Sequence, residues 1–407
     1  MTAQPIAEAG EPAGTEGRRP GGMLREYRVE IVIGLLFLVV LYGGWVRFHY
    51  LTRESLWLDE LWTWQIADKE TLSDVLWESQ LQKDVHPPLY FIMHYFLQKY
   101  AGDSEWLLRA PSATAGVLTI VAMFLLGRRL YSDTEGLIAA GLTAVLWFPI
   151  HYSQEARAYM MLGLFTTLSA WLWVCVMEPL CAGRRPKAWA VVGYVVTATT
   201  AAAVHYFGLL IVGFQALAAA ALLARRRPKV LPLLPLAYIP LAAYYVWWWP
   251  VMRRALAIEH FWIPKPGYDA FYDYIRRLFN ISDVLAWAAL AVLAWTAGMM
   301  LYRASPGRRL PDDTSQDRLP FRDLLLVIWL VVPFVAVFIR SRLATPVLTN
   351  KNLIILMPAV YLLVARGVTL VPARRWVHAL IGTLITTGLA VHLFVGLGYG
   401  RVIFKDQ

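Results

Sequence analysis

The sequence predicts an all-helical protein that crosses a membrane many times. Hydrophobic residues make up 58% of the 407 residues and charged residues only 16%, and the mean hydropathy is clearly positive. Soluble domains carry more charge than this. Apolar runs of about 18 to 22 residues, each long enough to cross a hydrocarbon core of about 30 Å, recur from end to end. The composition therefore excludes a soluble globular domain.

These runs predict about eleven transmembrane helices. Residues 198–207 also fit a tight hairpin, so the expected number is eleven, give or take one or two. The expected spans are residues 31–50, 110–130, 137–152, 159–177, 189–205, 207–223, 231–249, 284–302, 324–339, 353–365 continuing to 371, and 377–397.

The basic residues predict the orientation of these spans. Arginines and lysines occur before the first span and then cluster in every second loop, which is the pattern of cytoplasmic loops. The net charge of +10 therefore reflects topology, and a nucleic-acid partner is not expected because no soluble domain gathers the charge. The clusters are Arg128-Arg129, Arg184-Arg185-Lys187, Arg225-Arg226-Arg227-Lys229, Arg303-Arg308-Arg309 and Arg374-Arg375.

The chain divides into a short tail and one membrane domain. Residues 1–22 are rich in Gly, Pro, Glu and Ala without periodicity, which predicts a disordered cytoplasmic tail. Residues 23–407 form the transmembrane domain, with a first extracytoplasmic loop at 51–109 and a second large one at 250–283. The only cysteines, Cys175 and Cys181, lie near a cytoplasmic boundary and predict neither a disulfide nor a metal site.

The first loop is expected to contain two short helices. Thr71 to Asp74 has the pattern of a helix cap, and Pro87-Pro88 begins a second helix that ends near Gly102. This second helix is too short to cross a bilayer. We expect it to lie in the interface, with His94 at the level of the lipid headgroups.

The acidic pair Asp59-Glu60 is the strongest functional signal in this loop. It follows the first span directly and is surrounded by Trp57, Trp62 and Trp64. Carboxylates at a membrane surface are costly to desolvate, so they usually have a function. The structural alternative is that both residues cap a short helix, where adjacent side chains point about 100° apart and need not share a role.

Positive charges also occur on the outer side, against the orientation rule. Their presence favours binding of an anion there, and a lipid phosphate is the anion available at that depth. The structural alternative is that they reach the headgroups as interfacial residues. These residues are Arg109, Arg157, Arg340, Arg342 and Lys351.

Four motifs together resemble the GT-C membrane glycosyltransferases, and most closely glycosyltransferase family 39. That family includes protein O-mannosyltransferases and bacterial lipid A aminoarabinose transferases. The resemblance covers about residues 28–371 and is strongest over 56–159. The motifs are Asp59-Glu60, His86-Pro87-Pro88-Leu89-Tyr90, Arg109-Ala110-Pro111-Ser112 and Gln154-Glu155-Ala156-Arg157-Ala158-Tyr159.

The resemblance implies a GT-C fold and transfer of a sugar from a polyprenyl-phosphate donor to a hydroxyl acceptor, which is a lipid, a glycan or a protein. It places the reaction on the extracytoplasmic face of a bacterial inner (plasma) membrane, with inversion at the anomeric carbon. Asp59 would be the general base and Glu60 the second catalytic carboxylate. It implies no cofactor or metal. The implied substrate-binding residues are His86, Tyr90, Arg109, Gln154, Glu155, Arg157, Tyr159, Arg342 and Lys351.

Other function classes remain open at this point. The chain shows neither the soluble domain of aminoarabinose transferases nor the luminal insert of eukaryotic mannosyltransferases, so the acceptor does not follow from the resemblance. A lipid or glycan transporter would also place charges among spans, although it usually shows inverted repeats. A non-catalytic assembly subunit would not need the acidic pair. A metal-dependent oligosaccharyl transferase would need more carboxylates, and Glu155 is the only further ligand in view.

Overall fold

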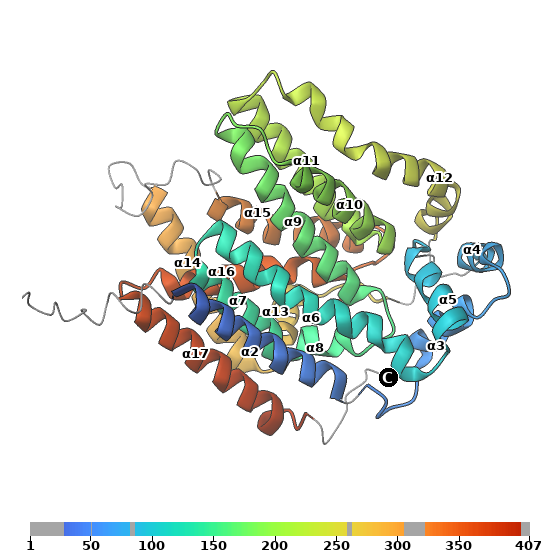
Figure 1. Ribbon diagram of the computed structural model, residues 1–407, viewed down its shortest axis with the longest axis horizontal. Helices are drawn as coiled ribbons and strands as arrows, with labels where there is room; N and C mark the ends of the chain where they lie inside the picture. Colours follow the sequence, from blue (N-terminus) through green and yellow to red (C-terminus); the bar gives the residue numbers. More distant parts are fainter. Residues whose placement is uncertain (1–27, 50, 82–85, 259–262, 305–321, 400–407) are drawn as a thin grey trace, which may run out of the picture.

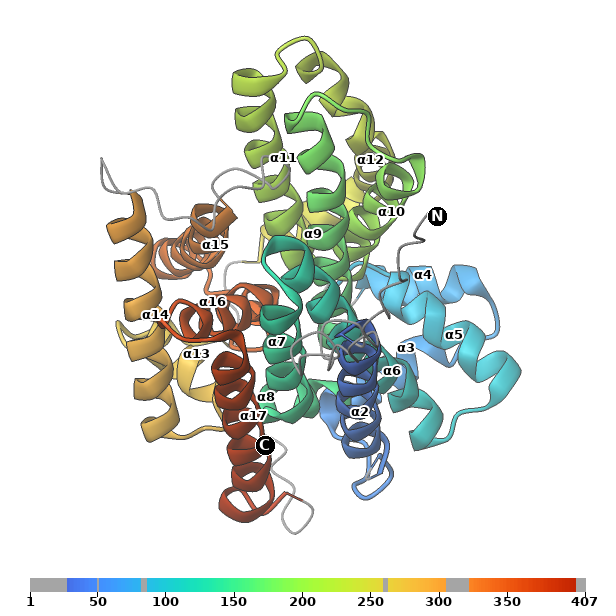
Figure 2. The ribbon, with the colours of Figure 1, turned by 60° about the vertical axis from the view of Figure 1, so that its left-hand side comes forward.

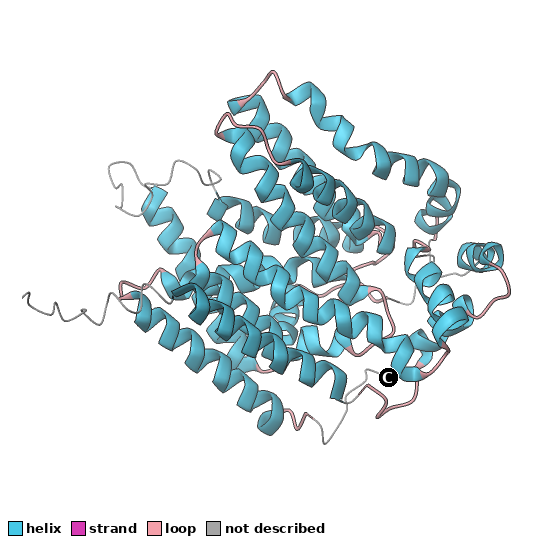
Figure 3. Cartoon of the chain, viewed as in Figure 1, coloured by secondary structure: helices cyan, strands magenta, loops and turns pink. Residues whose placement is uncertain are grey.

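The computed structural model describes residues 28–49, 51–81, 86–258, 263–304 and 322–399. Every regular element in these ranges is a helix (Figure 3). The expected tail at 1–22 lies outside the described residues. The elements are α2 (Arg28–His49), α3 (Leu58–Ala67), α4 (Leu72–Leu81), α5 (Leu89–Ala101), α6 (Glu105–Leu130), α7 (Asp133–Val145), α8 (Trp147–Ser153), α9 (Tyr159–Cys181), α10 (Ala188–Val204), α11 (Phe207–Arg226), η1 (Leu231–Tyr238), α12 (Ile239–Leu256), α13 (Ala270–Leu278), α14 (Asp283–Ala304), α15 (Arg322–Leu343), η3 (Asn352–Leu356), α16 (Met357–Thr369), α17 (Arg375–Val391) and η4 (His392–Gly396).

The helices are those of a multi-pass membrane protein. Within the described ranges, nine are long and apolar enough to cross a membrane, and the number is ten if α7 and α8 form one bent span. Each of the eleven expected spans falls on a helical segment. The count of eleven is not confirmed, because α10 has 17 residues and is shorter than the nine.

One helix lies at the centre of the bundle. In an 18-residue apolar stretch of each span, 83% of the residues are buried by protein in η3–α16, against 11% in α2 and 17% in each of α14 and α17. α16 lies among α7, α14, α15 and α17 (Figure 2). Apolar residues on the outer helices therefore face lipid, which needs no polar partner on that surface.

The break between α7 and α8 is held from both sides. The two helices meet at 59°, which leaves carbonyls at the end of α7 and an N–H at the start of α8 without helical partners. Arg47 of α2 donates to the Thr143 carbonyl at 2.8 Å. The Asn280 side chain accepts from the Trp147 N–H at 2.8 Å. These bonds fix the direction in which α8 leads into the turn at 154–158.

The short helices α3, α4 and α5 form one group at the right-hand end of the molecule (Figure 1). The predicted cap of α4 is confirmed, because the Thr71 hydroxyl donates to Asp74 at 2.6 Å and accepts from its N–H at 3.2 Å. The predicted end of α5 is also confirmed. Gly102 follows it with φ 104°, a conformation that strains residues with a side chain.

The His94 side chain does not face lipid headgroups. The side chain is fully buried by protein, packed with its ring centroid 4.5 Å from that of Tyr90. Burial lowers the pKa of His94 to about 3, because the charged imidazolium would lose its hydration. The buried face of α5 is therefore the face that carries Tyr90, His94 and Tyr95, and it packs against the rest of the protein.

Candidate active site

The two carboxylates of the acidic pair point to different surroundings. α3 begins at Leu58, so Asp59 and Glu60 both lie in its first turn, where adjacent side chains diverge by about 100°. Glu60 is fully buried. The Asp59 side chain keeps 23% of its surface exposed. The pair therefore supplies one inward and one accessible carboxylate.

Glu60 forms a buried ion pair with Arg109 of α6. Arg109 donates from Nε to Oε1 and from Nη2 to Oε2, both at 2.7 Å, which is the two-pronged geometry that guanidinium and carboxylate groups favour. Glu60 also accepts from the Ala156 N–H at 2.8 Å and from the Trp57 N–H at 3.3 Å. This carboxylate thus joins α3, α6 and the turn at 154–158.

The remaining donors of Arg109 hold the start of the first loop. Its Nη1 donates to the carbonyls of Leu51 at 2.6 Å and Glu54 at 2.7 Å, and Nη2 donates to the Ser55 carbonyl at 3.1 Å. Arg109 is only 1% exposed. Its geometry is that of a residue that positions the loop carrying Asp59, rather than one that faces a bound phosphate.

Asp59 forms an ion pair with Lys351, which lies 292 positions away in the sequence. The Lys351 Nζ donates to Asp59 Oδ2 at 3.0 Å. The same ammonium lies 5.7 Å from the ring centroid of Trp57 and 5.3 Å from that of Tyr159, within range of cation–π attraction. Two aromatic rings and one carboxylate therefore surround this cation.

The loop that presents Lys351 is fixed at both ends. The Ser341 hydroxyl of α15 accepts from the N–H groups of Val347 at 3.0 Å and Leu348 at 2.9 Å. The Asn350 side chain donates to Asp273 of α13 at 2.7 Å. Burial by itself lowers the pKa of Lys351, but Tyr159 and Asp59 outweigh it and hold the pKa above its ordinary value. Lys351 is therefore a positioned, charged ammonium.

Arg157 adds a second cation beside Asp59. Its Nη1 donates to the Asp59 carbonyl at 3.2 Å, and its guanidinium lies 5.8 Å from the ring centroid of Tyr159. The Ser112 hydroxyl donates to the Arg157 carbonyl at 3.1 Å and so holds the backbone of Arg157. Because a hydroxyl has only one hydrogen to donate, Ser112 accepts its second hydrogen bond from the Tyr90 hydroxyl, also at 3.1 Å. Tyr90 thus supports the backbone of Arg157, and it also lines a small cavity together with Arg157 and Tyr159.

Gln154 and Glu155 have different environments in the same turn. Gln154 donates to the carbonyls of Val46 and Arg47, each at 3.2 Å, and accepts from the Tyr399 hydroxyl at 2.9 Å. It therefore ties the turn to α2. Glu155 is 4% exposed, with Oε1 3.3 Å from His151 Nε2. Its Oε2 is buried and has no hydrogen-bond partner among the described residues.

Two cavities meet at a pair of histidines that the sequence did not bring together. The ring centroids of His86 and His205 are 4.8 Å apart. Each of the two histidines lines both cavities. One cavity is water-sized, about 10 Å³, and also touches Arg157 and Tyr159. The other is a groove of about 390 Å³ lined by apolar residues of α11, α12 and α15, with Asn352 and Arg340 among its few polar ones. The two histidines therefore lie between the groove and the small cavity that touches Arg157.

His205 has a defined proton arrangement. Its Nδ1 accepts from the Phe207 N–H at 3.2 Å, so a neutral His205 ring carries its proton on Nε2 and donates from there. The sequence offered only one hint that His205 belongs to the site, which is that it follows an expected span directly, at the turn before α11. From sequence alone, a histidine that only forms a turn cannot be distinguished at that position from one that binds a ligand.

Arg342 lies in a different environment from the other expected cations. It donates to the Pro266 carbonyl at 3.2 Å and lies 5.0 Å from the ring centroid of Tyr268. These contacts place it against the second large loop. Within the part of the chain that the structure describes, no group of three or more His, Cys, Asp or Glu residues is arranged to hold a metal ion.

The helical order and this outer site can be compared with known proteins. Residues 85–249 match the family model described as dolichyl-phosphate-mannose-protein mannosyltransferase. The structure of ArnT from Cupriavidus metallidurans in the apo state aligns over 94% of this chain with a TM-score of 0.59 at 15% identity. This chain has the GT-C fold. The resemblance to the GT-C glycosyltransferases that the motifs predicted is therefore confirmed.

Two further structures align with this GT-C protein. ArnT from Cupriavidus metallidurans bound to undecaprenyl phosphate aligns over 90% of the chain, with a TM-score of 0.50 and 14% identity. The Archaeoglobus fulgidus oligosaccharyltransferase AglB, in complex with an inhibitory peptide and a dolichol-phosphate, aligns over 92%, with a TM-score of 0.54 and 12% identity. The chain spans 66% of the apo ArnT chain, 64% of the ligand-bound ArnT chain and 56% of the AglB chain. No curated protein sequence matches it.

Proposed function

We propose that this protein transfers a sugar from a polyprenyl-phosphate donor to a hydroxyl acceptor, with inversion, at the site formed by Asp59, Arg157 and Lys351. The observation that carries the proposal is an accessible carboxylate paired with Lys351. Arg157 donates to the backbone carbonyl of the same aspartate and lines a small cavity that shares His86 and His205 with an apolar groove. The family match at residues 85–249 and the GT-C fold support the same reaction class. The undecaprenyl phosphate in ArnT and the dolichol-phosphate in AglB support a polyprenyl carrier.

The proposed reaction is a single displacement. Asp59 accepts the proton of the acceptor hydroxyl as the oxygen bonds to the anomeric carbon. The bond from that carbon to the phosphate oxygen breaks, and its electron pair leaves with the polyprenyl phosphate. Lys351 and Arg157 stabilise the charge on the phosphate. Glu60 and Arg109 act as positioning residues, because their hydrogen bonds join the loop and the turn that carry these groups.

The ion pair between Asp59 and Lys351 suggests how donor binding prepares the base. In the absence of donor, the Lys351 ammonium neutralises Asp59 at 3.0 Å. A lipid phosphate is a stronger and more highly charged acceptor for the same ammonium. When the phosphate binds Lys351, Asp59 loses its cation and becomes available to the acceptor hydroxyl.

The groove fits the lipid part of the donor. Its volume of about 390 Å³ and its apolar walls suit the first isoprene units. His86 and His205 stand between the groove and Arg157, where a lipid must change from hydrocarbon to phosphate. We therefore propose that both histidines contact the phosphate or its first carbon units.

The experiment that tests this function uses purified protein and a panel of polyprenyl-phosphate sugars, beginning with mannose. Release of free polyprenyl phosphate is followed with and without hydroxyl acceptors. We expect release with at least one donor, and an increased donor KM in the Lys351→Ala variant because a ground-state contact to phosphate is lost. Movement of the intact donor across vesicles without any release would instead identify a transporter. A chain that neither releases nor moves any donor would fit a non-catalytic subunit.

We propose that this site faces the extracytoplasmic side of a bacterial inner membrane and that the N-terminus is cytoplasmic. The alternating basic loops support this orientation. Single cysteines at the exposed positions 53 and 226, in a chain with Cys175 and Cys181 replaced by Ser, are labelled from one side of sealed vesicles. We expect reagent on the outer side to reach only position 53. Labelling of both positions from the same side would exclude the proposed topology.

A further inference from the structure

Arg47 is a buried cation in the first span that the proposed reaction does not use. It lies near the end of α2 and is fully buried by protein. Its hydrogen-bond partners among the described residues are one hydroxyl and three carbonyls, with no carboxylate among them. A charged side chain inside a span is costly, and its presence there points to a function.

The Arg47 guanidinium joins the two halves of the broken span. On the α7 side, Nη2 donates to the Thr143 carbonyl at 2.8 Å and Nη1 to the Ala144 carbonyl at 3.4 Å. Both carbonyls lie in the last turn of α7, where the negative end of the helix dipole offers a counter-charge to a cation. On the α8 side, Nε donates to the Ser153 hydroxyl at 3.1 Å. One side chain therefore holds the end of α7 and the end of α8.

Ser153 is the last residue of α8, directly before the turn at 154–158. It is fully buried, and its hydroxyl donates to a carbonyl of its own helix while it accepts from Arg47. The next residue, Gln154, donates to the carbonyls of Val46 and Arg47. The start of the turn is therefore tied to α2 through both the side chain and the backbone of Arg47.

A glycine of α6 leaves room for this bond. A Cβ built on Gly116 would overlap the Ser153 hydroxyl oxygen and would lie 2.6 Å from Arg47 Nε. Interiors of proteins are close-packed, so an alanine at this position must push the two groups aside. The crossing of α2, α6 and α8 (Figure 1) therefore accommodates the bond between Arg47 and Ser153.

The same turn carries Arg157. Four residues beyond Ser153, Arg157 donates to the Asp59 carbonyl at 3.2 Å and lines the small cavity that His86 and His205 share with the groove. Residues 154–158 form no regular helix. The place of the Arg157 side chain therefore depends on where the turn begins as well as on the contacts at its end.

We propose that Arg47 is a positioning residue for Arg157, acting through Ser153 and the turn, and that it thereby sets the affinity of the site for the donor phosphate. The inference rests on the proposed function, in which Arg157 binds that phosphate. Arginine suits this place because its planar fork donates to α7 and α8 at the same time, whereas a lysine has a single donor atom.

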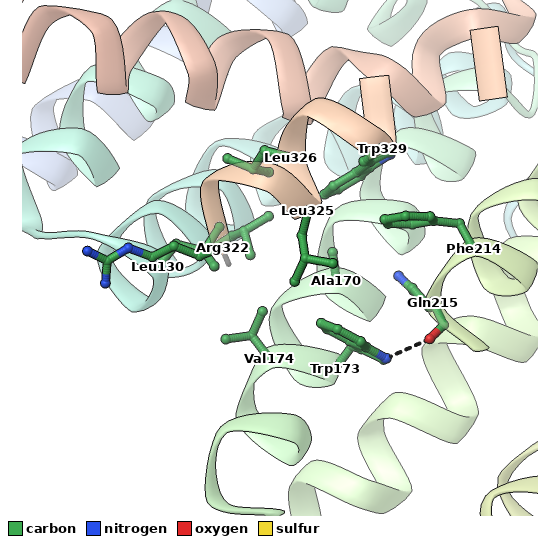
Figure 4. A pocket seen from close by; sticks show the side chains of 11 residues that line it. Leu130, Ala170, Trp173, Val174, Phe214, Gln215, Arg322, Leu325, Leu326 and Trp329 are labelled. Carbon is green, nitrogen blue, oxygen red and sulfur yellow. Dashed lines mark hydrogen bonds between the residues drawn. The ribbon is translucent and has the colours of Figure 1, made fainter. Parts of the chain in front are cut away.

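The test removes one bond and keeps the charge of Arg47. Ser153→Ala deletes the acceptor of Arg47 Nε. Ser169→Ala on α9 is the matched control, because Ser169 is also fully buried, accepts from the Gln215 side chain of α11 at 3.0 Å and donates to a carbonyl of its own helix. Gln215 lines a separate apolar pocket, where the Trp173 indole donates to its carbonyl at 3.1 Å (Figure 4). The control therefore removes an equivalent bond elsewhere in the bundle.

The probes are undecaprenyl phosphate and undecaprenol, which lacks the phosphate. Their dissociation constants are measured with purified full-length protein in nanodiscs. We expect Ser153→Ala to weaken undecaprenyl phosphate binding by about three- to tenfold, the scale of a partly lost hydrogen bond to a charged group, and to leave undecaprenol binding unchanged. Ser169→Ala should change neither. In a protein that already carries Arg157→Ala, the Ser153→Ala change should have no further effect, because it acts through Arg157.

Gly116→Ala disturbs the same bond from α6, without altering either partner. We expect it to weaken undecaprenyl phosphate binding as Ser153→Ala does, and again only while Arg157 is present. Unchanged undecaprenyl phosphate binding in either variant, equal weakening for undecaprenol, or a full additional loss in the Arg157→Ala background would overturn the proposal and leave the proposed function intact. A wild-type protein that binds undecaprenyl phosphate no better than undecaprenol would refute the proposed function itself.

Discussion

The Asp59→Asn variant is expected to lose about two to four orders of magnitude in turnover, because asparagine keeps the size and polarity of the side chain but cannot accept the proton of the acceptor hydroxyl. Donor binding should remain close to that of the wild type. In the variant, Lys351 keeps a polar neighbour at the position where Asp59 Oδ2 now lies, 3.0 Å away. The measurement is the transfer rate at saturating acceptor, together with donor affinity.

A matched control for this variant lies at the other end of the same helix. Asp68 follows α3 and is exposed, so Asp68→Asn removes the same charge without touching the proposed base. We expect it to keep wild-type turnover. Near-normal turnover in Asp59→Asn would contradict the catalytic role of Asp59 and return attention to the transporter and assembly-subunit interpretations. Equal losses in both variants would indicate a general electrostatic effect.

The Arg109→Leu variant is expected to be the most destabilising single change in the site, by about 3 to 5 kcal/mol, because it leaves the carboxylate of Glu60 buried without its ion-pair partner. It also removes the donors to the carbonyls of Leu51, Glu54 and Ser55. Thermal unfolding in detergent and the rate of proteolysis within residues 51–109 measure the effect. Arg53→Leu, at an exposed arginine in the same loop, is the control for loss of a positive charge and should change both measurements far less, because no buried carboxylate loses its partner.

This variant separates two roles for Arg109. A residue that positions the loop affects stability, loop protection and turnover together. A residue that contacts the phosphate directly affects donor binding while stability is kept. A stable, protease-resistant Arg109→Leu protein with weakened donor binding would therefore contradict the positioning role and restore the role that the family resemblance implied.

Much of the local structure follows from the sequence. Apolar runs become helices because a backbone in lipid must satisfy its hydrogen bonds internally, whatever the neighbouring helices do. The cap at Thr71 and the end of α5 at Gly102 are equally local, since each depends on atoms within a few residues. The exact number of spans is less certain from sequence, because α10 has only 17 residues and because α7 and α8 are joined at 59°.

The motifs also identified most of the residues that meet at the outer site, but they could not assign contacts. Glu60 and Arg109 appeared in separate motifs with separate expected roles, and the fold joins them in one buried ion pair. His94 appeared to be an interfacial residue because its neighbours are amphipathic, yet it is fully buried. In both cases the missing information was the second surface against which the helix packs.

The sequence by itself determined the membrane-spanning helices, the motifs of the GT-C proteins and the presence of an acidic pair directly after the first span. Only the tertiary structure decided which carboxylate of that pair is buried, which cation faces the other, and that His86 and His205 meet at an apolar groove. The reason is physical. Helix formation in a membrane depends on local composition, whereas the contact between Asp59 and Lys351, 292 positions apart, exists only after α3, the turn before α9 and the loop before η3 have packed together.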